Sequence, residues 1–173
     1  QYIASDHLSE LTLAILQKDR QKDPSAGYAR DGVPMLAELW PLAAKHDVKF
    51  VLNAGGLNPE GARQAIAKTF RDKGWKAKIA TVTGDSVLER IDELRAAGEP
   101  LAHMDTGADI AGVRDRMLFA SAYLGAQPIA QALSQGADIV LTGRVADAAL
   151  TLGPLAYEFG WQWDDWDRMA AGL

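Results

Sequence analysis

Short apolar runs alternate with amphipathic stretches along most of the chain. Runs of consecutive apolar residues predict buried strands, whereas apolar residues spaced three and four apart predict helices. The predicted strands are residues 49–53, 78–82, 117–122 and 138–142, with residues 2–4 as the end of another. The predicted helices are residues 7–19, 127–135 and 148–159, with others beginning near residues 36, 59 and 86. This alternation predicts an α/β fold with a mostly parallel sheet, helices on both faces and a Rossmann-like layering.

Local signals refine these elements. Residues 58–60 (Asn-Pro-Glu) are typical of a helix start, and Ser86 with Glu89 has the spacing of a capping box. Pro41 and the Gly153-Pro154 pair lie inside predicted helices, so we expect both to kink or interrupt them.

The length and composition indicate one globular domain. The chain has 173 residues, of which 48% are hydrophobic and 24% charged, which suits one sizeable core. It begins at Gln1 rather than Met and ends soon after a predicted helix start. We therefore expect residues 1–173 to be a single α/β domain that is a piece of a longer protein.

Charge and cysteine content narrow the functional classes. The formal net charge of -5 argues against a nucleic-acid or anionic-membrane partner, because both favour an excess of Lys and Arg. The absence of cysteine excludes disulfides and thiolate metal sites. His7, His46 and His103 show no ligand spacing, so no metal site is predicted. With neither a signal peptide nor a membrane-length apolar run, we expect a cytoplasmic protein.

Ligands of open α/β proteins bind beyond the carboxyl ends of the strands. Asn53, Gly55 and Gly56 lie between a predicted strand and a helix, where glycines and free amides suit an anion. A tight turn that requires glycine explains them equally well. A P-loop is excluded because Ala62 and Arg63 occupy the positions of its Lys and Ser/Thr. The chain also lacks the glycine fingerprint of a dinucleotide site, and we assign no cofactor.

Polar residues follow the other predicted strands. Arg144 comes after a Thr-Gly pair, where its guanidinium could clamp a carboxylate or phosphate or form an ion pair with Asp147 or Asp85. Asp6, Asp85 and Asp147 could each be a general base, a metal ligand, a hydroxyl acceptor or merely a helix cap. We expect Arg144, Asn53, Gly55, Gly56 and Asp6 to bind substrate. No serine lies in a nucleophile-elbow motif, so a hydrolase triad is not predicted.

Two further features complete this set of candidates. Tyr123 follows the predicted strand at 117–122 and could assist Asp85 and Asp147 as an acid. Three tryptophans, Trp161, Trp163 and Trp166, are interleaved with acidic residues near the end of the chain. We expect these indoles to be covered by the remainder of the same protein or by a partner subunit. We also expect the protein to be a homo-oligomer.

Several of these segments, in this order, resemble the acyclic terpene utilisation (AtuA-like) family, formerly a domain of unknown function. The matching stretches are residues 7–12 (HLSELT), 53–59 (NAGGLNP), 84–85 (GD), 122–126 (AYLGA), 136–140 (GADIV), 142–147 (TGRVAD), 159–161 (FGW) and 164–167 (DDWD). The resemblance covers nearly the whole chain. Ser121 departs from it, since an asparagine is expected there.

The resemblance implies a role in the breakdown of acyclic terpenoids and branched acids through CoA thioesters. We expect an enzyme, or enzyme subunit, of hydratase, lyase or isomerase type that acts on a small anionic substrate or acyl-CoA. Asp85 or Asp147 would move the proton, with Tyr123 as the acid. The alternative is a non-catalytic anion-binding or assembly subunit that uses the same pocket.

Overall fold

The structure, a computed structural model, describes all residues from 1 to 173 and contains one parallel sheet. Its strands are β1 (Tyr2–Ser5), β2 (Lys49–Leu52), β3 (Ile79–Val82) and β4 (Ile139–Thr142), in the spatial order β1-β2-β4-β3. Every pair is parallel, and the central strands align Val51 with Val140. The predicted α/β class is confirmed.

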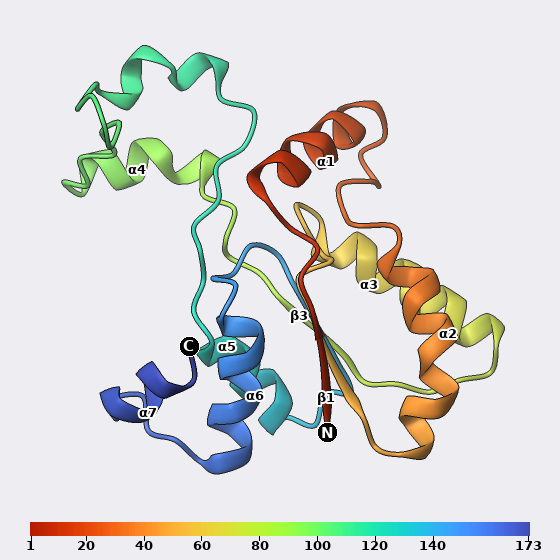
Figure 1. Cartoon of the computed structure of the whole chain (residues 1–173). Helices are drawn as coiled ribbons and strands as arrows, with labels where there is room; N and C mark the ends of the chain where they lie inside the picture. Colours follow the sequence, from red (N-terminus) through yellow and green to blue (C-terminus); the bar gives the residue numbers. More distant parts are fainter.

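Helices cover both faces of the sheet, as predicted (Figure 1). On one face, α2 (Gly32–Lys45) and α3 (Pro59–Asp72) enclose a core that includes Trp40, Phe50 and Phe70. On the other, α5 (Gln127–Ser134) and α6 (Ala149–Phe159) pack over Val51 and Val140. The sheet is therefore buried on both sides, which explains why its strands are continuous apolar runs.

The strand order places a topological switch point between β2 and β4, because the helices that follow these two strands cover opposite faces of the sheet. The helix after β2 lies on the α2–α3 face, whereas the helix after β4 lies on the α5–α6 face. The carboxyl ends of β2 and β4 are adjacent and thus form the switch point at which open α/β sheets bind ligands. Helix α1 (Glu10–Lys22) follows β1 and lies beyond this edge of the sheet (Figure 1).

Residues 86–121 form a lobe that projects from the sheet (Figure 1). An antiparallel bridge between Ser86 and Ser121 closes its base. Inside are three 3-10 turns (Leu88–Arg90, Ile110–Gly112 and Arg114–Arg116) and α4 (Ile91–Ala96). Ser86 therefore pairs with Ser121 rather than capping a helix.

The predicted strand at 117–122 is wrong. This segment is extended, but its only ladder contact is the bridge at Ser121. Its apolar side chains belong elsewhere: Phe119 packs against the small cluster formed by Leu8, Leu13 and Leu16. The fourth strand of the sheet is β1 instead. An apolar run by itself does not distinguish a strand from an extended segment, such as residues 117–122, that lies outside the sheet.

The prolines do not end their helices. Pro41 lies inside α2 and Pro154 inside α6, and both helices run continuously past them. The expected interruptions are thus not found, because packing against the sheet outweighs the loss of one hydrogen bond. No helix has both the length and the apolar content needed to cross a bilayer.

The tryptophan-rich segment ends in the short helix α7 (Trp166–Ala171). Trp166 is 74% exposed and Trp163 is 37% exposed, whereas Trp161 is only partly exposed and stacks on Phe159. Apolar surface therefore gathers at this end of the chain. The partner or further segment predicted to cover it stays a prediction.

Candidate functional site

The carboxyl edge of the sheet brings the predicted site residues together. Asp6 follows β1, Asn53 follows β2, Asp85 follows β3 and Arg144 follows β4. Tyr123 reaches the same edge at the end of the lobe, where its ring covers the guanidinium of Arg144 at 4.0 Å. A parallel sheet produces this convergence because all its strands end on one side.

Asn53 is fully buried and holds the loop between β1 and α1. Its Oδ1 accepts a hydrogen bond from the backbone N–H of His7 at 2.6 Å, and its amide nitrogen donates to the Asp6 carboxylate at 2.6 Å. The same Asp6 oxygen accepts the N–H of Leu8 at 3.0 Å. Asn53 thus positions this loop over the switch point, and Asp6 is the member of the network that reaches solvent.

The two glycines after Asn53 serve a tight turn. A Cβ on Gly55 would lie 2.5 Å from the carbonyl oxygen of Thr142 and 2.9 Å from Pro59. Gly56 has a φ of +53°, which favours glycine. The turn lets the backbone at Gly55 lie directly against the end of β4 at Thr142, so backbone occupies this part of the switch point.

Arg144 is enclosed, with only 3% of its surface exposed. Its Nη1 donates to the carbonyl of Leu8 and its Nη2 to the carboxylate of Asp147, both at 3.0 Å. Its Nε is buried without a partner. Of the two ion pairs considered from the sequence, the one with Asp147 is present. The structure therefore places this side chain beneath the β1–α1 loop rather than in an open cleft.

Asp85 is also buried, at 4% exposure, and accepts the backbone N–H of Arg144 at 2.9 Å. Burial is the main reason that the pKa of its carboxyl lies above the ordinary value, and this backbone hydrogen bond opposes the shift. Its carboxyl occupies the space where Gly143 would carry a side chain. Asp85 thus joins the ends of β3 and β4 and does not cap a helix.

Asp147 and Tyr123 lie at the solvent side of this network. The Asp147 side chain is 67% exposed, and Tyr123 is 52% exposed. The Tyr123 hydroxyl donates to the Glu10 carboxylate at the start of α1. This hydrogen bond raises the pKa of Tyr123 and lowers that of Glu10. The two groups are accessible, but they lie beside Arg144 rather than in the cleft described next.

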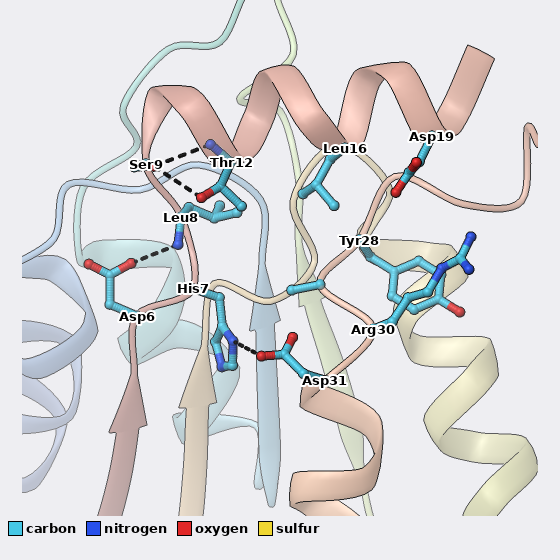
Figure 2. A pocket seen from close by; sticks show the side chains of 11 residues that line it. Asp6, His7, Leu8, Ser9, Thr12, Leu16, Asp19, Tyr28, Arg30 and Asp31 are labelled. Carbon is cyan, nitrogen blue, oxygen red and sulfur yellow. Dashed lines mark hydrogen bonds and ion pairs between the residues drawn. The ribbon is translucent and has the colours of Figure 1, made fainter. Parts of the chain in front are cut away.

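The largest hollow at this edge is a cleft of about 690 Å³ between the β1–α1 loop, α1 and the segment that leads into α2 (Figure 2). Among the predicted residues only Asp6 lines it. Sequence reasoning missed the others with polar side chains, which are His7, Ser9, Thr12, Asp19, Tyr28, Arg30 and Asp31. They all lie between residues 7 and 31, but they form no motif, because the cleft arises only when the segment that leads into α2 folds back beside the β1–α1 loop.

His7 is the group in this cleft best suited to proton transfer. Its Nε2 lies 3.0 Å from the Ser5 hydroxyl, and its Nδ1 lies 3.7 Å from the Asp31 carboxylate (Figure 2). The His7 side chain is 10% exposed and that of Asp31 is 79% exposed. A carboxylate beside Nδ1 favours the proton there, which leaves Nε2 free to accept from Ser5. No three His, Asp or Glu side chains are grouped to hold a metal ion.

Comparison with known protein families identifies the family of this chain. The model of the family described as "Acyclic terpene utilisation family protein AtuA" matches residues 1–173, the whole chain. No match was found among curated proteins, and none among solved structures.

Proposed function

Because this chain belongs to the acyclic terpene utilisation family, we propose that it forms the site of an enzyme acting on a carboxylate or acyl-CoA intermediate. The intermediate would come from acyclic terpenoid or branched-acid breakdown. The reaction would be of the hydratase, lyase or isomerase type. The observation that carries the proposal is the His7 imidazole, which lines the 690 Å³ cleft with a carboxylate beside one ring nitrogen.

Reactions of these types move a proton at a carbon near a carbonyl group. A general base or acid within reach of that carbon contributes roughly 10²–10⁴-fold to such a step. Histidine suits both roles near neutral pH. His7 would carry the proton, and Asp31 would orient the imidazole ring through Nδ1.

The cleft also offers a binding group for an anion. The Arg30 side chain lines the far side of the cleft, is exposed and has no hydrogen-bond or ion-pair partner within the protein, so its guanidinium is available to a carboxylate or phosphate. The cleft volume lies within the roughly 300–1,000 Å³ typical of small-molecule sites. Arg30 would therefore orient the acid or CoA portion of the substrate.

The residues predicted from the sequence acquire different tasks in this proposal. Asn53 and Arg144 hold the β1–α1 loop through Asp6, His7 and Leu8, so they position the loop that bears the reacting group. Asp85 anchors Arg144 from below. We assign these buried residues positioning roles.

Replacement of His7 tests the proposal. In the purified protein, His7→Gln should lower turnover of an enoyl-CoA or hydroxyacyl-CoA panel by at least about 100-fold. The matched control is His46→Gln, at the opposite end of α2 and exposed. Equal turnover by the two variants would exclude His7 as the proton carrier, and no turnover by the wild type across the panel would count against the enzyme itself.

A second candidate function is a non-catalytic assembly subunit, which the exposed Trp163, Trp166 and Phe159 favour. Large exposed apolar patches often mark protein interfaces. In that case, Trp166→Gln would abolish assembly while His7→Gln would leave it unchanged. Sedimentation velocity of the two variants distinguishes these outcomes.

A further inference from the structure

Ser5, His7 and Asp31 stand in the order of a nucleophile, a base and an orienting acid. The Ser5 hydroxyl contacts His7 Nε2 at 3.0 Å, and the opposite ring nitrogen faces the Asp31 carboxylate at 3.7 Å. Neither the Asp31 carboxylate nor the His7 ring has another hydrogen-bond or ion-pair partner in the structure. The sequence did not predict a hydrolase triad because no elbow motif is present, but a triad is defined by geometry rather than by motif.

The fold explains why the three side chains meet. Ser5 is the last residue of β1, and side chains two residues apart in extended chain point to the same side, which brings His7 beside it. Asp31 precedes α2, and α2 packs on the face of the sheet to which Ile3 also points. The carboxyl end of one strand therefore faces the beginning of one helix.

We propose that Ser5 is the nucleophile of an acyl-transfer activity on thioesters in this cleft. This activity uses the cleft of the proposed function but is a separate reaction. Ser5 is partly exposed, and its hydroxyl contacts His7, which lines the cleft. The 3.7 Å separation at Asp31 must shorten on binding, as is common for catalytic contacts in ligand-free sites.

The proposed reaction is an acyl transfer to Ser5 followed by hydrolysis, and it requires only the thioester and water. The Ser5 oxygen attacks the thioester carbonyl carbon while its proton passes to His7 Nε2. The C–S bond then breaks, and the leaving thiolate takes that proton and departs as a thiol. Water hydrolyses the resulting serine ester in the same manner and releases the acid. The backbone amides of Arg30 and Asp31 belong to residues that line the cleft and donate no hydrogen bond within the protein, so they would be available to the oxyanion.

A fluorophosphonate probe with intact-mass and peptide-mass analysis tests the assignment. The wild-type protein should gain one adduct, on Ser5, and Ser5→Ala should gain none. His7→Gln should slow labelling by at least about 100-fold, because the base is lost. The control Ser134→Ala, an exposed helix serine, should label like the wild type. An unlabelled wild-type protein, an adduct on another serine, or labelling of Ser5→Ala would overturn the proposal.

A second measurement does not depend on the probe. The chain has no cysteine, so Ser5→Cys introduces a single thiol. Next to His7 this thiol should react with iodoacetamide at least about 10-fold faster than the thiol of Ser134→Cys, since a neighbouring imidazole favours the thiolate. The advantage should vanish when His7→Gln is added. Equal rates for the two single variants would refute the role of His7 as base.

Different results would refute the proposed proton-transfer function and the proposed acyl-transfer activity. Proton-transfer turnover of acyl-CoA by a wild-type protein that does not label at Ser5 overturns the acyl-transfer activity alone. Labelling of Ser5 in a protein that turns over no enoyl-CoA or hydroxyacyl-CoA overturns the proposed function alone.

Discussion

Replacing Arg144 with alanine should lower the free energy of unfolding by about 2–4 kcal/mol. The largest contribution comes from the Leu8 carbonyl, which loses a charged donor at 3.0 Å in a buried place. The loss of the guanidinium stacked at 4.0 Å on Tyr123 adds about 0.5–1 kcal/mol. The ion pair with Asp147 adds little, because that carboxylate is 67% exposed to water.

One feature of Arg144 limits the loss of stability in the alanine variant. Its Nε is already buried without a partner, and removing this orphan donor relieves a desolvation cost. The total should therefore be smaller on average than the roughly 3–5 kcal/mol that is typical when a fully satisfied buried pair is broken. Arg144→Lys keeps the charge but reaches only one of the two acceptors, so it should lose roughly 1–2 kcal/mol.

Urea unfolding followed by far-UV circular dichroism gives these differences by linear extrapolation. Arg63→Ala is the matched control, because Arg63 forms an exposed ion pair with Glu60 on α3. It should change stability far less than Arg144→Ala. If the two alanine variants have the same midpoint and slope, the claim that Arg144 holds the β1–α1 loop is refuted.

Three further predictions follow from the same edge of the sheet and from α7. Gly55→Ala should lower the free energy of unfolding by about 1–3 kcal/mol, because the new Cβ would lie 2.5 Å from the Thr142 carbonyl oxygen. Gly125→Ala should have little effect, because the space around Gly125 is open, and thermal unfolding of both variants checks this. Asp85→Asn should stabilise the protein at neutral pH, because the raised pKa means that wild-type stability falls as pH rises from the unfolded value of 3.8 through the folded one. The advantage should shrink as urea midpoints are measured toward pH 3, and an advantage independent of pH would contradict it. Trp166→Phe should remove most acrylamide-quenchable indole emission with little change in stability; unchanged quenching would show that this indole is covered.

The sheet and its helices could be predicted from local patterns because buried parallel strands are continuous apolar runs. The predicted strands at 49–53, 78–82 and 138–142 match β2, β3 and β4 closely, and Asn58 accepts the Gly61 amide as a helix cap. The strand at 117–122 failed because Phe119 packs against the cluster of Leu8, Leu13 and Leu16, while Leu118 is largely exposed, so neither side chain lies in the sheet. Hydrophobicity reports burial, whereas pairing depends on what lies beside the segment.

The candidate site was predictable only in part. Strand-end position placed Asn53, Asp85 and Arg144 at one edge correctly, but it gave no information on whether their side chains face solvent or one another. The cleft depends on the contact between His7 and Asp31, which are 24 positions apart and joined by no motif. A contact set by the packing of α2 on the sheet has no local signature in the sequence.

Nuclear magnetic resonance of the histidine rings tests the central claim, that substrate occupies the cleft beside His7, most directly. The chain has three histidines, so His46 and His103 serve as internal controls in the same sample. On titration with a branched enoyl-CoA, the His7 ring signals should shift saturably while those of His46 and His103 stay in place. Binding that leaves the His7 signals unchanged, or that shifts all three alike, would contradict the account.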